Sequence, residues 1–328
     1  RRPRRKVAWA WCLVDSSERT GPDDSPENHG LENCSLRISQ AHAQGRFAIS
    51  FELFPPKDAE AESKLFRQTV PALLELGPDF MTCTYGAGGS TQDKTLEVVA
   101  RIKADHGIEM ASHLTCVGGS RESIAAYLRQ THANDIRNIV ALRGDPPRDD
   151  RTFEPAPDGF RYARDLVAFI RRQGDFDIAV AGYPEGHPEC PDKYLDWRHC
   201  REKVEAGAHV IITQLFYDLN DFYEFDDYMK NRLGVAVPIV PGILPILSGP
   251  QIERFCSLCG ARIPTAIRER LASFGDDRAA SRDYGVELAT RMCEELIRRG
   301  VPGFHFYTLN RVESTREILL NLRLASRL

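Results

Sequence analysis

The chain has 328 residues, of which 42% are apolar and 27% charged, and its 43 basic and 47 acidic residues leave a net charge of −4. This composition is typical of a globular protein with a large core, in one large domain or two ordinary ones. Acidic and basic residues are mixed throughout, and no apolar stretch is long enough to span a bilayer. We therefore expect neither nucleic acid nor a membrane as a partner.

The cysteines indicate a reducing compartment. Nine of them form an odd, scattered set, and several sit inside apolar runs. This usage is typical of reduced thiols in a cytoplasmic protein rather than of a disulfide framework. Cys256 and Cys259 have the spacing of half a zinc site, but no second pair completes four ligands, so no metal is expected.

The first 44 residues differ from the rest of the chain. A basic cluster at 1–6 is followed by a stretch rich in Ser, Asp, Glu, Pro and Asn. Such a segment cannot bury enough apolar surface to offset the entropy lost on ordering it. We expect residues 1–44 to be a disordered, dispensable extension and residues 45–328 to form a single domain.

After residue 45, short runs rich in β-branched and aromatic residues alternate with helical segments, one unit in roughly 30 residues. This alternation predicts a parallel sheet with helices on both faces. Eight such units in about 280 residues match a closed (β/α)8 TIM barrel in number and length. The predicted strands span 47–51, 80–84, 109–115, 136–142, 177–181, 209–214, 237–242 and 303–309.

An open, doubly wound sheet is the alternative α/β architecture. Against it, no Gly-x-Gly-x-x-Gly pattern follows the first predicted strand. The connection between the last two predicted strands, 243–302, is the longest and is expected to hold two or three extra helices, one of them beginning near Ser248. Insertions of this kind usually cover or shape the site of a barrel.

Polar residues stand where the predicted strands end, and in a barrel these ends converge on one face. They include an acid, an imidazole, an Arg-Gly-Asp turn, a carboxamide and several phenols, a richer set than strand-end polarity alone requires. Glu52 is the most informative, because it closes an apolar run and Pro55 and Pro56 follow it closely. Poor solvation there favours the protonated carboxyl that a general acid needs, although a strand-end Glu paired with a neighbouring cation is the alternative.

Eight segments carry a more specific pattern, in order along the chain. They are Ser-Phe-Glu-Leu-Phe-Pro-Pro at 50–56, Thr-Tyr-Gly-Ala at 84–87, His-Leu-Thr-Cys at 113–116, Ile-Val-Ala-Leu-Arg-Gly-Asp at 139–145, Ala-Gly-Tyr-Pro-Glu-Gly-His-Pro-Glu at 181–189, Thr-Gln-Leu-Phe at 213–216, Pro-Gly-Ile-Leu-Pro at 241–245 and Phe-His-Phe-Tyr-Thr-Leu-Asn-Arg at 304–311. With these segments the chain resembles the methylenetetrahydrofolate reductase family. The resemblance implies an FAD-containing barrel that reduces 5,10-methylenetetrahydrofolate to 5-methyltetrahydrofolate with NADH or NADPH, in the one-carbon metabolism that supplies methionine.

The family's chemistry assigns roles to two acidic residues. In its ping-pong order, FAD takes a hydride from the nicotinamide, which leaves before the folate binds. Glu52 matches the acid that protonates a bridging nitrogen of the folate and opens its ring to an iminium cation. Asp145 matches an aspartate beside the flavin and the pterin, where its negative charge disfavours the anionic reduced flavin and stabilises the iminium.

The binding residues are also implied by the resemblance, position by position. Expected FAD contacts are Thr84, Tyr85, Ala87, His113, Arg143, Gly144, Asp145, Ala163, Tyr183, His187, Asp196 and Lys203. Expected substrate contacts are Gln214 and Gln251 on the pterin or its attached benzoate, Phe255 as a stacking position shared by the alternating substrates, and the basic Arg311.

Some features depart from the family or stay open. Glu202 stands where some relatives carry a second base, so the grip on the flavin phosphates is expected to rest on Lys203 and Arg143. The loop at 146–160 is long, and its effect on adenosine binding is open. The alternative functions are a flavin-barrel reductase fed by a protein electron donor and a non-catalytic regulator that binds flavin or folate. The sequence does not choose between NADH and NADPH, nor between a monomer and a homo-oligomer.

Overall fold

The structure is a computed structural model that describes residues 37–43, 45–85, 92–145 and 155–325. In this part of the chain nine parallel strands form one sheet. Almost every strand residue is buried, which explains why the strands appear in the sequence as near-continuous apolar runs. The strands are β1 (Ala48–Leu53), β2 (Phe80–Cys83), β3 (Glu109–Thr115), β4 (Asn138–Leu142), β5 (Asp177–Gly182), β6 (Val210–Thr213), β7 (Ile239–Val240), β8 (Gly242–Ile243) and β9 (Gly303–Tyr307).

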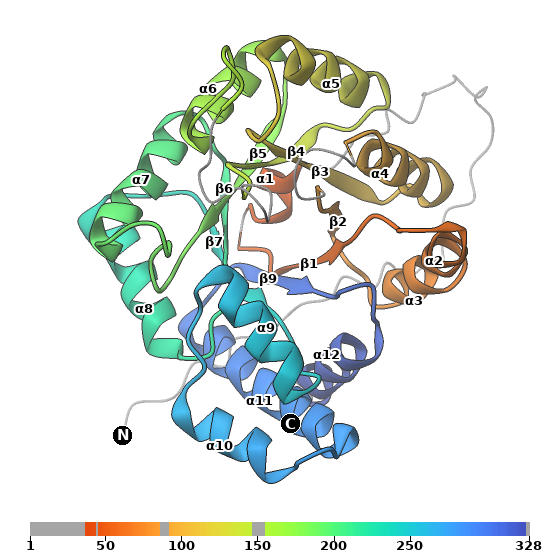
Figure 1. Ribbon diagram of the computed structural model, residues 1–328, viewed down its shortest axis with the longest axis vertical. Helices are drawn as coiled ribbons and strands as arrows, with labels where there is room; N and C mark the ends of the chain where they lie inside the picture. Colours follow the sequence, from red (N-terminus) through yellow and green to blue (C-terminus); the bar gives the residue numbers. More distant parts are fainter. Residues whose placement is uncertain (1–36, 44, 86–91, 146–154, 326–328) are drawn as a thin grey trace, which may run out of the picture. The chain divides into compact units, whose positions relative to one another are not determined.

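The sheet closes through a strand that proline divides. The order β7-β6-β5-β4-β3-β2-β1-β9-β8 leaves β7 and β8 at opposite ends, although only Pro241 separates them in the chain. Proline has no N–H for the ladder, but the carbonyl of Pro241 accepts a hydrogen bond from the His305 nitrogen at 3.0 Å. The seventh predicted strand is therefore two short ones, and together they complete the expected (β/α)8 barrel (Figure 1).

Side chains from the neighbouring strands brace this divided strand. The hydroxyl of Tyr307 donates to the Thr213 carbonyl at 2.6 Å, and the nitrogen of Gly242 donates to Thr213 Oγ1 at 2.9 Å. A Cβ on Gly242 would lie 2.1 Å from the Thr213 carbonyl oxygen. Only glycine allows this approach, which ties β6, β8 and β9 together at the closure.

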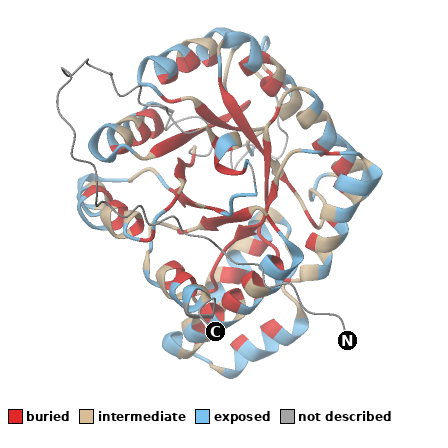
Figure 2. Ribbon diagram, turned by 180° about the vertical axis from the view of Figure 1, so that it is seen from behind, coloured by how far each residue is buried: buried red, intermediate tan, exposed pale blue. Residues whose placement is uncertain are grey.

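Helices surround the ring of strands (Figure 1). The exposed faces of these helices form the surface, whereas the strands and the inward faces of the helices are buried (Figure 2). The helices outside the barrel are α2 (Ala59–Lys64), α3 (Val70–Leu74), α4 (Gln92–His106), α5 (Arg121–Ala133), α6 (Ala163–Gln173), α7 (Lys193–Glu205), α8 (Leu219–Asp227), α9 (Gly249–Cys259), α10 (Thr265–Ser273), α11 (Arg278–Arg299) and α12 (Glu313–Ala325), with single π turns at Leu65–Thr69 and Tyr228–Arg232.

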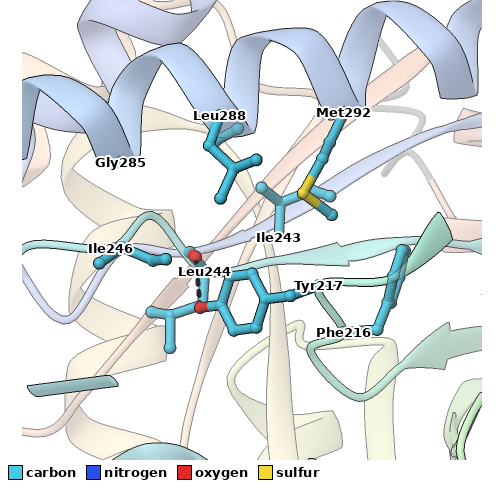
Figure 3. Close-up of a pocket in the computed structure, with 9 residues that line it drawn as sticks. Phe216, Tyr217, Ile243, Leu244, Ile246, Gly285, Leu288 and Met292 are labelled. Carbon is cyan, nitrogen blue, oxygen red and sulfur yellow. Dashed lines mark hydrogen bonds between the residues drawn. The ribbon is translucent and has the colours of Figure 1, made fainter. Parts of the chain in front are cut away.

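Three of these helices, α9, α10 and α11, lie between β8 and β9, which confirms the expected insertion. Ser248 caps α9 by accepting a hydrogen bond from the Gln251 nitrogen. Leu288 and Met292 of α11 point toward Ile243 and Tyr217 around a small apolar gap, where the Tyr217 hydroxyl donates to the Leu244 carbonyl (Figure 3). This contact packs the long α11 against the barrel.

The amino-terminal end of the barrel is closed by a short helix, α1 (Ile38–Ala41). Ile38 and Ala41 are fully buried in the apolar cluster inside the barrel, and α1 is seen inside the ring of strands in Figure 1. The Ile38 nitrogen donates to Asn138 Oδ1 at 3.0 Å, and Arg37 pairs with Asp175 at 2.7 Å. The expected boundary after residue 44 is therefore wrong for residues 37–43, which belong to the barrel. The rest of the expected extension, 1–36, lies outside the described residues.

Candidate active site

A buried carboxyl group lies at the carboxyl end of β1. Glu52 is 8% exposed, and its Oε2 is 3.6 Å from the Nε2 atoms of both His113 on β3 and His305 on β9. Alternation along a strand places Glu52 inside the barrel, because Phe51 and Leu53 belong to the core outside it. Barrel closure thus holds one carboxyl group between two imidazoles from different strands.

The backbone around Glu52 is held by the segment that follows β9. Thr308 Oγ1 donates to the Glu52 carbonyl at 2.6 Å, and the Asn310 side chain makes two hydrogen bonds of 2.9 Å with the nitrogen and oxygen of Phe54. Leu309 and Asn310 have φ values of 52° and 56°, a left-handed conformation that is uncommon for residues other than glycine. Unusual backbone conformations of this kind cluster at functional sites, where the surrounding contacts stabilise them.

The imidazole of His113 is held neutral. Burial lowers its pKa to about 4, and His305 adds to this effect, whereas Glu52 opposes it. His113 Nε2 also lies 3.2 Å from Thr82 Oγ1 on the neighbouring strand. A neutral, oriented imidazole can exchange hydrogen bonds with the carboxyl group of Glu52 without adding a charge.

The Arg-Gly-Asp segment follows β4. Arg143 makes two hydrogen bonds of 2.6 Å to the carboxylate of Glu189, which together with that partner's charge raise the pKa of Arg143. Gly144 has φ +83°, and a Cβ there would lie 2.7 Å from Val117. Asp145 is exposed, and its charge acts on Arg143 and Tyr183. The glycine therefore turns the chain so that a cation and an anion stand side by side at the rim.

Four further predicted residues lie after β5 and on α7. The rings of Tyr183 and His187 are 4.7 Å apart, and burial raises the pKa of the Tyr183 phenol. Lys203 donates to the Ala181 carbonyl. Asp196, seven residues earlier on the same helix, has a buried Oδ2 without a hydrogen-bond partner among the described residues. Burial raises the Asp196 pKa, while Lys203 acts in the opposite direction.

The predicted substrate residues come from three elements. Gln214 follows β6 and lines a small pocket together with Tyr183. Gln251 Oε1 accepts from the Leu247 nitrogen at 2.9 Å, whereas its buried Nε2 finds no partner within the described part of the chain. Phe255 is half-buried one turn further along α9, and Arg311 is exposed after β9.

Four predicted positions remain, of which three lie in the described part of the chain and make few contacts that bear on a site. Thr84 is buried after β2, where its carbonyl accepts from Thr95 Oγ1 at 2.9 Å. Burial raises the pKa of Tyr85 to about 12. Ala163 is the first residue of α6, and Ala87 lies outside the described residues.

Sequence reasoning missed several residues of this site, namely Ser50, Glu189, His305 and Thr308. Ser50 could have been found, because a residue two positions before Glu52 shares its face of the strand. His305 also sat inside a predicted strand, but only the pairing of β9 with β1 shows that it faces Glu52. Cys256 and Cys259 lie on α9 and join no cluster of metal-ligating side chains in the described ranges.

Comparison with known proteins decides the family. The sequence model of the family described as methylenetetrahydrofolate reductase matches residues 37–323. The chain belongs to the methylenetetrahydrofolate reductase family. The matched region begins at Arg37, the first described residue, so α1 is part of the family domain as well as of the barrel.

Relatives from plants and bacteria share this similarity. The probable methylenetetrahydrofolate reductase (NADH) of rice is 41% identical over 299 residues, which cover 88% of this chain and 50% of the relative. The chain thus spans about half the length of the plant relatives it matches. The 5,10-methylenetetrahydrofolate reductase of Escherichia coli K12 is 38% identical over 290 residues, covering 88% of this chain and 95% of that protein.

A solved structure supports the fold. A Clostridium thermocellum protein described as binding two copies of 5-methyl-5,6,7,8-tetrahydrofolic acid aligns with a TM-score of 0.62 at 18% identity, over 89% of this chain and all of that one. Similarity at this level of identity shows the barrel fold alone. Among the described helices of this family member, none combines the length and apolarity that crossing a membrane requires.

Proposed function

We propose that the chain is a flavin-dependent methylenetetrahydrofolate reductase that uses NADH or NADPH to form 5-methyltetrahydrofolate. The observation that carries the proposal is the position of Glu52, a buried carboxyl group between His113 and His305 at the carboxyl end of a barrel strand. Active sites of this fold lie at that end. The names of the bacterial relatives support the substrate, and those of the plant relatives support NADH as the donor.

The residues around the rim fit FAD. The unpartnered, buried Oδ2 of Asp196 suits a hydroxyl donor such as those of the ribityl or ribose groups. Arg143 and Lys203 supply positive charge for the phosphates, and Gly144 lets the backbone turn without a side chain in the way. Bound there, the flavin supplies the two-electron chemistry that joins nicotinamide and folate.

The described residues also fit the folate. The unpartnered Nε2 of Gln251 suits an acceptor on the pterin, or a carbonyl beside it, and Gln214 offers a second carboxamide. Phe255, on the same face of α9 as Gln251, presents a ring for stacking. A carboxamide carries both a hydrogen-bond donor and a hydrogen-bond acceptor, which suits a pterin edge that displays both.

Two carboxyl groups divide the chemistry between them. Glu52 donates its proton to a bridging nitrogen of the folate, which opens the five-membered ring to an iminium cation. Asp145, exposed at the rim, provides a fixed negative charge that stabilises this cation. A buried acid and an exposed carboxylate in one site are the environments that these two roles require.

The test uses the flavin colour in two separate half-reactions. The purified yellow protein should bleach with NADH or NADPH and recolour with methylenetetrahydrofolate. In Glu52→Gln the bleaching rate should persist, whereas recolouring should slow by about 10²-fold or more, the scale of a general acid. The same substitution at exposed Glu287 of α11 is the control and should leave both rates unchanged.

Other outcomes would point to the alternative functions. Equal losses in both half-reactions of Glu52→Gln would make Glu52 a structural residue. If the flavin bleaches only when a reduced protein is the electron donor, that donor would replace the nicotinamide in the proposal. A wild-type protein that binds flavin and folate but passes no electrons would be a non-catalytic regulator.

A further inference from the structure

Three segments of the chain meet at one arginine, Arg262, which follows α9. Its backbone nitrogen and its Nε donate to the carboxylate of Glu185, at 3.0 and 2.9 Å, and its Nη2 donates to Asp221 Oδ2 at 2.6 Å. Glu185 lies in the loop after β5, and Asp221 in the first turn of α8. Arg262 therefore joins the connection between α9 and α10 to two segments that follow barrel strands.

Each of the joined segments carries a residue that lines one small pocket. Tyr183 stands two positions before Glu185, Gln214 lies between β6 and α8, and Cys259 is the last residue of α9. Tyr183, Gln214 and Cys259 line the pocket together with Gly260. A movement of any one of these segments would reshape the pocket, and the arginine ties all three.

One face of α9 is directed toward the candidate site. Gln251, Phe255 and Cys259 are four residues apart, so they lie in one row along the helix, and all three are half-buried. We call this row the α9 stripe. Because Cys259 lines the pocket beside Gln214, the orientation of α9 that brings in Cys259 also sets the positions of the other two residues.

The carboxyl end of α9 is shaped to approach the loop after β5. Gly260 ends the helix with φ 78°, and a Cβ on this residue would lie 3.0 Å from Pro188. A residue without a side chain allows both the left-handed turn and the close contact. Arg262 then adds its hydrogen bonds two residues further on, so the helix end is both packed and paired.

The acidic partners depend on the arginine more than its exposure suggests. The side chain of Arg262 is 64% exposed, but those of Glu185 and Asp221 are only 11% and 14% exposed. Burial raises the pKa of both carboxyl groups, and Arg262 opposes this shift, as Lys193 does at Asp221. An ion pair between exposed groups contributes little, whereas loss of the cation here leaves two largely buried carboxylates that repel each other.

We propose that Arg262 is a positioning residue that holds the carboxyl end of α9 to Glu185 and Asp221 and thereby keeps the α9 stripe against the bound substrates. The proposal rests on the proposed function, which assigns Gln251 and Phe255 to the folate. Arg262 acts through α9 and is not a catalytic residue. Its loss should weaken substrate binding and leave the limiting rates of the two half-reactions nearly unchanged.

The first experiment follows the position of the helix end without using activity. The flavin-bound, full-length protein is pulsed with N-ethylmaleimide, and mass spectrometry measures the alkylation of Cys259. In Arg262→Ala this alkylation should become about tenfold faster, because the helix end opens more often. Cys190, another half-buried thiol, should react at its wild-type rate and is the internal reference.

A matched control tests whether any exposed arginine with two acidic neighbours has this effect. Arg298 of α11 is 61% exposed and pairs with Glu294 and Glu295, but both partners belong to its own helix. Arg298→Ala should leave the alkylation rate of Cys259 and both half-reactions as in the wild type.

The second experiment measures substrate binding in each half-reaction. In Arg262→Ala the methylenetetrahydrofolate concentration that gives half the limiting rate should rise about tenfold, whereas the limiting rate itself should stay within about twofold. The half-saturating concentration of the nicotinamide should rise by a smaller factor. Of the α9 stripe, only Phe255 is assigned to both substrates.

Two further variants examine the ionic contact itself. Arg262→Lys keeps the charge, but one ammonium group cannot reproduce the forked contacts of a guanidinium, so both readouts should lie between those of the wild type and Arg262→Ala. Adding Asp221→Asn to Arg262→Ala removes one of the two unpaired carboxylates. The double variant should therefore alkylate Cys259 more slowly than Arg262→Ala alone. Arg262→Lys and the single Asp221→Asn supply the same readouts if Arg262→Ala does not fold.

Three outcomes would contradict these expectations. Unchanged alkylation of Cys259 and unchanged half-saturation in folded Arg262→Ala would overturn the proposal and make Arg262 a surface ion pair. Faster alkylation of Cys190 as well, with equal falls in both limiting rates, would also overturn it, because the loop after β5 would then be the part released. A wild-type protein that never recolours with folate would overturn the proposed function, while the alkylation of Cys259 would still decide whether Arg262 holds α9.

Discussion

The side chain of Asn310 and the backbone of Phe54 are joined by a reciprocal pair of hydrogen bonds, each 2.9 Å long, across the seam between β9 and β1. Asn310 itself has φ 56°, a conformation that asparagine tolerates better than most residues. The pair fixes the chain two residues beyond Glu52. A residue more than 250 positions away thus helps to hold the chain where it leaves the barrel after Glu52.

Two substitutions of Asn310 should separate the effect of its side-chain hydrogen bonds from the effect of its left-handed backbone conformation. Asn310→Ala loses both hydrogen bonds and keeps a Cβ in the left-handed conformation, so we expect the free energy of unfolding to fall by about 3 kcal/mol. Asn310→Gly loses the same bonds but fits the conformation, and should cost about 1 kcal/mol less. Both should slow folate reduction more than nicotinamide oxidation. Urea unfolding measures the stability of each variant, and the two half-reactions measure its activity. Equal stability of the two variants would mean that backbone strain at Asn310 does not contribute.

The negative charge of Asp145 should lower the midpoint potential of the bound flavin. Asp145→Asn removes a negative charge close to Arg143 and Tyr183, so the flavin should become easier to reduce and its midpoint potential should rise. Folate turnover should fall, because the iminium loses its counter-charge. Dye-coupled reductive titration gives the potential. Asp276→Asn, at an exposed position between α10 and α11, is the control, and a potential that fell or stayed unchanged would place Asp145 away from the ring.

Truncation should show where the barrel domain begins. Protein that starts at residue 37 keeps α1 and should retain its melting temperature, FAD and activity. Protein that starts at residue 45 exposes the pocket of Ile38 and Ala41 and loses the hydrogen bond from Ile38 to Asn138. We expect a loss of about 3 kcal/mol and a melting temperature lower by about 5–10 °C. Calorimetry measures this, and equal melting temperatures for the two proteins would mean that α1 adds nothing to stability.

The buried His113 should make the protein sensitive to mild acid. Its pKa is about 4 in the folded state, below the ordinary value of 6.5, so the unfolded chain takes up a proton first as pH falls. The stability contributed by the neutral imidazole is complete above about pH 6.5 and is lost as pH falls toward 4, to a total of about 3 kcal/mol.

Urea unfolding at a series of pH values measures this effect of His113. His113→Gln should flatten the decline between pH 6.5 and 4, whereas His199→Gln on the exposed face of α7 should leave it as in the wild type. An equally steep decline in His113→Gln would assign the acid sensitivity to other groups, of which His42 and His209 have pKa values lowered in the same direction.

The sequence by itself determined which segments form strands and which side chains stand at their ends. Apolar runs with β-branched and aromatic residues recur once per βα unit, and burial on both faces of the sheet makes them continuous and easy to locate. The same local signal placed Glu52, the turn around Gly144 and the insertion of α9 to α11. The resemblance of the family segments suggested chemical roles for Glu52 and Asp145, and these roles stay predictions.

Only the tertiary structure decided which of these residues meet. The pairing of β1 with β9 brings His305 and Asn310 to Glu52 and Phe54, and no local pattern encodes a contact over some 250 residues. The boundary error at residues 37–43 has the same origin. A four-residue helix has too little periodicity to be recognised in a polar segment, and α1 is stable only because the closed ring of strands offers Ile38 and Ala41 an apolar floor to fill.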